Sequence, residues 1–90
     1  MRRPYGLTVA PSASRSLDSL PERYAWALLV FIEGPLVETP YRVGRQLRLE
    51  LTGRFCARVR PYRVVYRVDE GARMVIVERI EHRADVYRPR

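Results

Sequence analysis

The spacing of apolar residues changes from a helical period to a strand period near Gly44. In residues 22–33, apolar side chains recur at i, i+4, i+7 and i+8 counting from Tyr24, so they share one face of a helix. In residues 46–51 and 54–60, polar and apolar side chains alternate, as they do in half-buried strands. This change of period predicts an α+β fold, with helices in the first half of the chain and a sheet in the second.

The first half of the chain predicts a short strand followed by a helical hairpin. Residues 6–10 alternate in polarity, and residues 14–20 carry leucines at helical spacing. Pro21 ends that helix and can open the next one, because the first helical position needs no backbone N–H. The Gly34–Pro35 pair is a conventional stop for the second helix, which is expected over residues 22–33.

Residues 35–45 are expected to be a loop that leads into four strands. These strands are expected at residues 46–51, 54–60, 62–68 and 74–80. Short turns join them, which implies an antiparallel meander. The two helices should cover one face of this sheet and leave the other partly open. Residues 1–90 are therefore expected to form a single domain of order β-α-α-β-β-β-β, with the helical hairpin packed on a mostly antiparallel sheet.

The cysteine and histidine content and the hydropathy pattern exclude several classes of protein. Cys56 is the only cysteine, so there is no internal disulfide, and with a single histidine no zinc pattern is formed. We expect no metal ion or other cofactor. The longest apolar run, residues 25–32, is far shorter than the roughly 18 residues of a membrane span, and the start of the chain is unlike a signal peptide. A soluble cytoplasmic protein without a membrane partner is expected.

The charge of the chain is carried by arginine alone and is unevenly distributed. All 17 basic residues are arginines, and the net charge is +7. Residues 1–44 hold five arginines against four acidic residues, whereas residues 45–90 hold twelve against six. Arginine binds anions but does not lose its proton near neutrality, so it is a poor general base. The basic half predicts a polyanion or an acidic protein as partner, with charge that merely aids solubility as the alternative.

One segment, residues 53–67, holds five arginines, two tyrosines and no acidic residue. Its arginines are Arg54, Arg58, Arg60, Arg63 and Arg67. The first three form a row on one face if the strand is uninterrupted, and the last two share a face of the next strand. Like charges side by side destabilise a sheet, so an anion such as phosphate would stabilise a uniformly basic face of this kind. An ordinary solvated face is the alternative.

A second cluster follows the last expected strand, in residues 81–87. His82 offers a titratable imidazole, Arg83 a permanent cation, and Tyr87 a phenol that can stack on a base or donate a proton. A lone histidine is more often an ordinary surface or hydrogen-bonding residue. Cys56 is expected to be a small packing residue near the basic face, where a thiolate would be favoured.

Three segments of the chain together resemble one toxin family. They are residues 47–53 (LRLELTG), 55–66 (FCARVRPYRVVY) and 80–87 (IEHRADVY). With the strand and helical hairpin before them, they are similar to the RelE branch of the RelE/ParE toxin superfamily. The resemblance implies the toxin of a type II toxin–antitoxin pair, which enters the ribosomal A site and cleaves mRNA there to inhibit translation. It also implies a cognate acidic RelB-like antitoxin, with DNA contacted only indirectly through the antitoxin complex.

The resemblance also implies roles for individual residues. Arg63 matches the arginine that holds the scissile phosphate, and Arg58 matches a basic position on the preceding strand. Arg83 and Tyr87 match a C-terminal arginine and a tyrosine that stacks on the mRNA base, and His82 belongs to a His-Arg pair of one subgroup. The implied catalytic residues are Arg58, Arg63, His82, Arg83 and Tyr87. The implied RNA-binding residues are Arg48, Arg54, Arg60 and Arg67.

The sequence departs from the family pattern at the proton acceptor. Some members carry lysines on the central strand, but Cys56 occupies such a position here and the chain contains no lysine. We hypothesise that His82 accepts the proton, with Glu81 as the fallback. Two other functions stay open, because a fold does not fix a function. One is inhibition of DNA gyrase in the manner of ParE toxins, and the other is RNA binding without catalysis.

Overall fold

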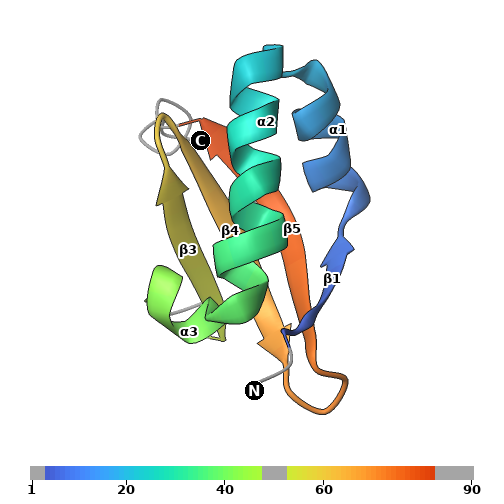
Figure 1. Cartoon of the computed structure of the whole chain (residues 1–90), viewed down its shortest axis with the longest axis vertical. Coiled ribbons are helices and arrows are strands. Elements are labelled where there is room, and N and C mark those ends of the chain that lie inside the picture. The colour runs from blue at the N-terminus through green and yellow to red at the C-terminus, as the bar shows by residue number, and fades with distance from the viewer. Residues whose placement is uncertain (1–3, 48–52, 83–90) are drawn as a thin grey trace.

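A five-stranded sheet of order β1-β5-β4-β3-β2 forms one layer of the molecule, and helices form the other (Figure 1). The computed structural model describes residues 4–47 and 53–82. The elements are β1 (Gly6–Val9), α1 (Pro11–Ser19), α2 (Glu22–Phe31), the π-helical turn η1 (Ile32–Leu36), α3 (Pro40–Val43), β2 (Arg45–Gln46), β3 (Arg54–Val59), β4 (Tyr62–Asp69) and β5 (Met74–His82). The expected α+β class is confirmed. Within the described ranges, no helix is long and apolar enough to cross a bilayer.

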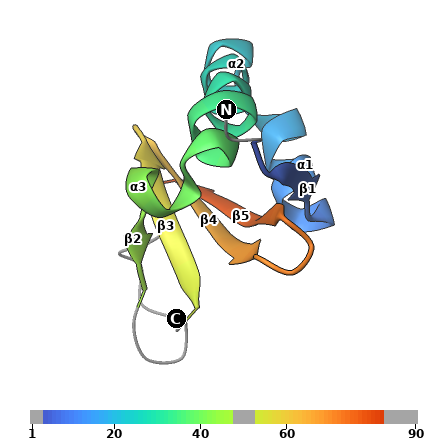
Figure 2. The same ribbon diagram turned by 60° about the horizontal axis from the view of Figure 1, so that its bottom comes forward.

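The strand pairings confirm the expected meander and add one parallel edge. Strands β2 to β5 pair antiparallel with their neighbours in chain order. Strand β1 pairs parallel with β5, so the first strand of the chain lies beside the last. Figure 2 shows α1 and α2 on one side of the sheet, whereas no described element covers the other side. We call this uncovered side the open face.

The core lies between the sheet and the helices. Leu28 and Ile32 project from the helical layer and are fully buried. Val64 on β4 and Val75 on β5 meet them from the sheet and are fully buried too. Each such side chain contributes roughly 1.5–3 kcal/mol when it leaves water. The alternation of β4 and β5, interrupted at Val65 and Tyr66, thus fixes which of their side chains face the helices and which face away.

The helical layer continues past the expected stop, which corrects the prediction for residues 35–45. The Gly34–Pro35 pair does not end α2, because the chain widens into the π turn η1. A regular α-helix would clash with the ring of Pro35, and the wider turn accommodates it. The continuation buries Leu36 and Val37 in the core. Another short helix, α3, then occupies residues 40–43, where a loop was expected.

Tyr66 fixes α3 against the sheet. Its hydroxyl donates a buried hydrogen bond of 2.6 Å to the carbonyl oxygen of Pro40, and its ring stacks on Phe55 with centroids 5.6 Å apart. Gly44 follows α3 at a point where a Cβ would lie 2.1 Å from the Tyr66 hydroxyl oxygen. Glycine is therefore required at position 44 by this close approach. The strand after it, β2, is Arg45–Gln46 and begins one residue before the expected range of 46–51. Residues 48–52 are outside the described part of the chain.

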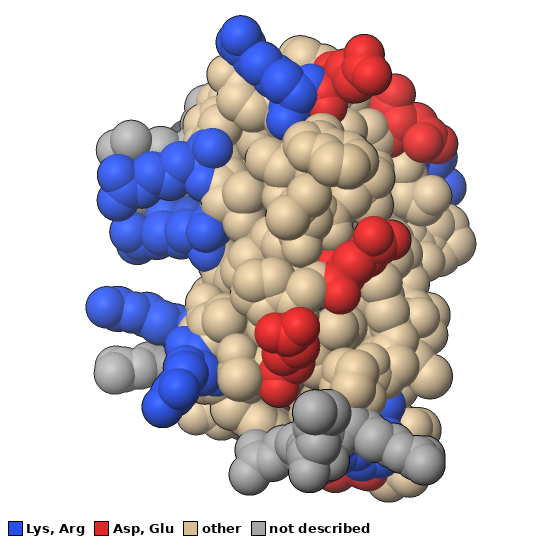
Figure 3. Space-filling model, viewed as in Figure 1, with Lys and Arg blue, Asp and Glu red and all other residues tan. Residues whose placement is uncertain are grey.

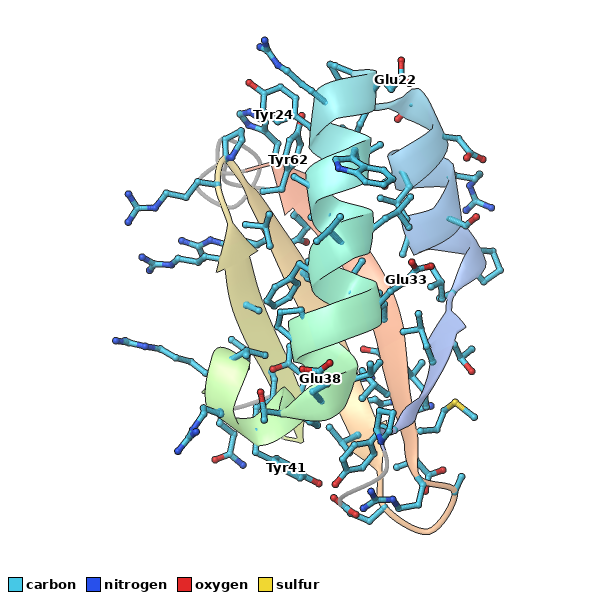
Figure 4. The ribbon with its side chains drawn as sticks, viewed as in Figure 1. Glu22, Tyr24, Glu33, Glu38, Tyr41 and Tyr62 are labelled. Atoms are coloured by element: carbon cyan, nitrogen blue, oxygen red, sulfur yellow. The ribbon has the colours of Figure 1, made fainter. Side chains whose placement is uncertain are left out.

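A cluster around Glu70 joins three segments that are far apart in the sequence. The Tyr5 hydroxyl donates to Glu70 Oε2 at 2.7 Å, and the Tyr41 hydroxyl of α3 donates to the same oxygen. The Arg73 guanidinium carbon lies 4.1 Å from the centroid of the Tyr5 ring. The cluster thereby connects the start of the chain and α3 to the hairpin between β4 and β5. Figure 4 shows Tyr41 at this end of the molecule.

The Glu70 cluster predicts an acid-dependent loss of stability. The hydrogen bonds from Tyr41 and then Tyr5 hold the pKa of Glu70 below its ordinary value of 4.5. A lowered folded-state pKa stabilises the fold above the unfolded-state value, and this contribution is lost as the pH falls through the folded-state value. Urea titrations at a series of pH values from above 4.5 downward measure this loss. As the pH falls, we expect the unfolding free energy of Glu70→Gln to decline less steeply than that of the unsubstituted chain. Parallel declines would contradict the role of Glu70.

Candidate nucleic-acid interface

The register of β3 and β4 gathers arginines on the open face. Arg58 lies directly opposite Arg63, and Arg54 lies directly opposite Arg67. Directly opposed residues of an antiparallel pair project from the same face of the sheet. Cys56 lies between the two pairs and faces Val65 across the strands. The two arginine pairs therefore lie on one surface, away from the helices, as the parity of the sequence predicts.

Cys56 reports on the charges that surround the Arg58–Arg63 pair. Burial raises the pKa of its thiol, with Arg63 and Arg58 lowering it and Glu81 raising it. The expectation that this position favours a thiolate is therefore wrong, because desolvation outweighs the two guanidinium groups. The same interactions place Arg58, Arg63 and Glu81 around one thiol. They form one compact group on the open face.

The second arginine pair carries its own carboxylate, which corrects the expectation of a uniformly basic face. Glu78 Oε1 lies 2.6 Å from Arg54 Nε, and Glu78 Oε2 lies 3.1 Å from Arg67 Nε. Glu78 comes from β5, the strand on the other side of β4. The sequence prediction considered residues 53–67 alone and missed it. In the sequence, Glu78 and Arg79 are two consecutive polar residues between the apolar Val77 and Ile80.

The end of β5 separates Glu81 from His82. Glu81 pairs with Arg63 and so belongs to the open face, where its Oε2 lies 3.4 Å from Arg79 Nη1. His82 pairs with Tyr62, and the two rings meet edge-on with centroids 5.2 Å apart. Tyr62 belongs to the side of the helices. The structure therefore does not bring His82 to the arginine pair, because successive residues of a strand face opposite sides.

Tyr62 connects His82 to the start of α2 through a chain of rings. The rings of Tyr24 and Tyr62 meet edge-on at 5.4 Å, and Figure 4 shows the two side by side. The Arg23 guanidinium lies over the Tyr24 ring and donates a 3.2 Å hydrogen bond to its hydroxyl. These contacts hold the start of β4 and the end of β5 against the start of α2. The ring of His82 is thus part of an aromatic cluster on the side of the helices.

The remaining expected site residues are Arg60 and three residues outside the described ranges. Arg60 lies in the turn after β3, so the strand row ends with Arg58 and does not include Arg60. Arg48, Arg83 and Tyr87 lie outside the described residues. Among residues 4–47 and 53–82, no group of three His, Cys, Asp or Glu side chains could hold a metal ion. The described interface is thus built on β3, β4 and β5.

Charge is unevenly distributed over the side of the molecule that the helices cover. Figure 3 shows acidic side chains over the helical layer, with arginine side chains projecting beyond the edge at which β3 lies. The labelled acidic residues of this layer are Glu22, Glu33 and Glu38 (Figure 4). The layer also carries the exposed arginines Arg15 and Arg23, so its charge is mixed. A polyanion would therefore be attracted more strongly to the arginines at the edge of the sheet than to the helices.

Comparisons with known proteins point to one toxin family. The family model described as the ParE toxin of the type II toxin-antitoxin system, parDE, matches residues 7–87. Toxin RelG of Mycobacterium tuberculosis is 44% identical over 85 residues, which are 94% of this chain and 98% of that protein. Toxin RelE of the same organism is 41% identical over 85 residues, which are 94% of this chain and 88% of that protein.

Solved structures show the same fold. A chain of the toxin-antitoxin complex RelBE2 of Mycobacterium tuberculosis matches with a TM-score of 0.85 and 40% identity, covering 89% of this chain and 99% of that one. The YoeB/ParE toxin of Agrobacterium tumefaciens matches with a TM-score of 0.74 and 18% identity, covering 86% and 96%. The second likeness concerns the fold alone. Taken with the family model and the two relatives, these matches show that the chain belongs to the ParE toxin family of type II toxin–antitoxin systems, as a RelE-type toxin.

Proposed function

We propose that this toxin is a ribosome-dependent endoribonuclease that cleaves mRNA in the A site and so inhibits translation. The observation that supports the proposal is the pair formed by Arg58 and Arg63 across β3 and β4. Two like charges directly opposed destabilise a sheet, and a bound phosphate would remove that repulsion. Arg58 makes no ion pair with a carboxylate among the described residues. Its guanidinium group is available to an incoming anion.

The arginine pair suits the transition state of RNA cleavage. The 2′-hydroxyl of the RNA gives up its proton and its oxygen attacks the adjacent phosphorus. The bond from phosphorus to the 5′-oxygen breaks, which leaves a 2′,3′-cyclic phosphate, and the released 5′-oxygen takes up a proton to become a hydroxyl. Negative charge builds on the phosphate oxygens in between, and Arg58 and Arg63 would stabilise it from two adjacent strands. Neither arginine can accept the proton of the 2′-hydroxyl.

Glu81 is the side chain that the geometry favours as the proton acceptor. It pairs with Arg63 on the open face, and its contact with Arg79 restricts its orientation. His82, the acceptor first hypothesised, pairs with Tyr62 on the side of the helices. The family resemblance additionally assigns Arg83 to the phosphate and Tyr87 to stacking on the base. Both residues remain part of the proposal.

The choice between Glu81 and His82 gives a testable prediction. We expect Glu81→Gln to slow single-turnover cleavage on programmed ribosomes about 100-fold, which is the low end of the usual effect of losing a general base. We expect His82→Ala to retain most of the rate, because its ring packs edge-on against Tyr62 and its strand position faces the side of the helices. The reverse ranking of the two variants would restore His82 as the acceptor.

An acidic antitoxin of the RelB type is the proposed partner besides the ribosome and mRNA. Toxins of similar fold have been solved in RelBE complexes from Mycobacterium tuberculosis and E. coli. An acidic segment laid on the open face would neutralise the same arginines that we assign to RNA. DNA would then be contacted only through the antitoxin complex. We expect the bound antitoxin to abolish cleavage.

Induction in cells, followed by mapping of transcript ends, tests the proposed function. We expect cuts inside translated codons that depend on Arg63. Inhibition of DNA gyrase is the second candidate, since the matching family model is that of the ParE toxin. A supercoiling assay with purified gyrase separates the two functions. Strong salt-dependent RNA binding without any cleavage product would instead indicate a binding module.

A further inference from the structure

Glu78 reaches the open face through a bulge in β5. Val65 of β4 pairs with Arg79, and the next residue, Tyr66, pairs with Val77, so Glu78 is an extra residue without a partner. A bulge of this kind lets two successive residues lie on the same side of a sheet. Glu78 and Arg79 both face outward as a result, while Val77 stays fully buried. The bulge thus turns a carboxylate of β5 toward the arginines of β4 and β3.

The contacts of Glu78 hold two arginines and leave most of their donors available. Each carboxylate oxygen of Glu78 contacts the Nε atom of one arginine, Arg54 at 2.6 Å and Arg67 at 3.1 Å. A guanidinium group has five N–H donors, so the Nη hydrogens of both side chains remain. Neither arginine has a second ion pair among the described residues. The three side chains together still carry one net positive charge.

The second arginine pair is held apart from the first. At a rise of about 3.3 Å per residue, the four-residue offset between Arg54 and Arg58 separates the backbones of the pairs by about 13 Å along the strands. Glu78 holds Arg54 and Arg67 at their own end of the strands, so the two pairs do not converge on one phosphate. A strand of RNA that follows β3 and β4 would instead place two different phosphates over the two pairs.

We propose that Arg54, Glu78 and Arg67 form a second phosphate subsite, in which Glu78 is a positioning residue. The subsite binds another phosphate of the RNA strand whose scissile phosphate lies between Arg58 and Arg63. Glu78 itself does not touch the phosphate, since it is an anion. It orders two long side chains before RNA arrives, which lowers the entropy cost of binding. The inference deepens the proposed function by assigning a second contact on the same substrate.

Glu78→Gln distinguishes positioning from simple electrostatics, because the two predict opposite signs. The substitution removes a negative charge from the RNA-facing surface, so electrostatics alone predicts tighter binding. Loss of positioning predicts about tenfold weaker binding, since both arginine side chains must then be ordered by the RNA. Glu33→Gln is the matched control, because it changes the net charge equally from an exposed position in the helical layer. We expect the control to bind at least as tightly as the unsubstituted toxin.

A scan with neutral phosphates tests the subsite without requiring cleavage. The probe is a short single-stranded RNA, 2′-O-methylated to prevent cleavage, with one methylphosphonate moved along its backbone, and affinity is read by fluorescence anisotropy at low salt. We expect the toxin to lose affinity at two separate positions, and Glu78→Gln to lose sensitivity at only one of them. In a plot of the logarithm of the binding constant against the logarithm of salt concentration, the slope for Glu78→Gln should be shallower by about 0.7, as for one lost phosphate contact. Arg54→Gln and Arg67→Gln should lose sensitivity to the methylphosphonate at the same position, and neither substitution alters the bulge.

Several outcomes would overturn the inference, and they differ from failure of the proposed function. Equal or tighter binding by Glu78→Gln, or an unchanged methylphosphonate pattern, rules out a positioning role. On ribosomes, we expect Glu78→Gln to raise the KM for mRNA with little change in kcat. If that KM increase is independent of methylphosphonates in the mRNA, the bound phosphate belongs to ribosomal RNA and the inference is wrong. If no cleavage occurs but the two-position pattern holds, the subsite stands and the nuclease function fails.

Discussion

Arg63→Ala should lower the single-turnover rate of mRNA cleavage on programmed ribosomes about 1,000-fold. Removing one preorganised donor from a developing negative charge costs 100- to 1,000-fold in comparable sites. We expect the larger of these losses because Arg63 lies between Arg58 of β3 and Glu81 of β5. All three side chains surround Cys56. Quench-flow measurement with a labelled mRNA gives the rate directly.

The controls for Arg63 separate a loss of chemistry from a loss of charge. Arg15→Ala removes an equal charge from an exposed position on α1, and it should cleave at the unsubstituted rate. Arg63→Lys keeps the charge but loses the planar fork, so its rate should lie between those of the toxin and Arg63→Ala. A rate for Arg63→Ala within threefold of the control would remove the scissile phosphate from this pair.

Tyr66→Ala should destabilise the fold by about 3–5 kcal/mol, the usual cost of truncating a buried aromatic residue. Tyr66 is fully buried, stacks on Phe55 and fills the space that Gly44 leaves open. Domains of this size are stable by only about 5–15 kcal/mol, so the variant should be partly unfolded under mild conditions. The shift of the urea midpoint, multiplied by the m-value, measures the loss.

Tyr66→Phe isolates the hydroxyl of the same side chain. It leaves the Pro40 carbonyl oxygen buried without its 2.6 Å hydrogen bond, which should cost about 1–3 kcal/mol. Burial holds the pKa of Tyr66 well above its usual range, so the hydroxyl remains a donor throughout the measurable pH range. A loss for Tyr66→Ala no larger than that for Tyr66→Phe would contradict the packing role of the ring.

Alternation in residues 54–60 was sufficient to predict strand β3 and the side on which Arg54 and Arg58 lie. Successive side chains of a strand point to opposite faces of the sheet. The observed register accordingly has Arg58 and Arg63 on the open face and Val64 in the core. The pairing of β1 with β5 was beyond the reach of this rule. It brings together residues from opposite ends of the chain, and no local spacing specifies such contacts.

The differences between the expected and the observed structure have specific physical causes. The Gly34–Pro35 stop was overridden because burial of Leu36 and Val37 favours continuing the helical layer through a π turn. His82 was grouped with Arg83 by proximity in the sequence, whereas strand geometry turns it toward Tyr62. Local propensity is a weak guide wherever tertiary packing supplies several kcal/mol.

Glu78 was missed for a related reason. The arginines of residues 53–67 were judged by their own segment, but their carboxylate partner comes from β5. Only the strand order brings it next to Arg67, and only the bulge turns it outward. A break in alternation within a strand is therefore worth testing as a sign of a bulge next to a functional surface.

The most direct test of the arginine pair is to map the RNA ends that the toxin produces on ribosomes carrying a defined mRNA. The unsubstituted chain and the Arg58→Ala/Arg63→Ala double variant are compared at equal occupancy. We expect the toxin to cut within the A-site codon and to leave a 2′,3′-cyclic phosphate, and we expect no such ends with the double variant. Identical ends from both proteins at similar rates would contradict the assignment of the scissile phosphate to Arg58 and Arg63.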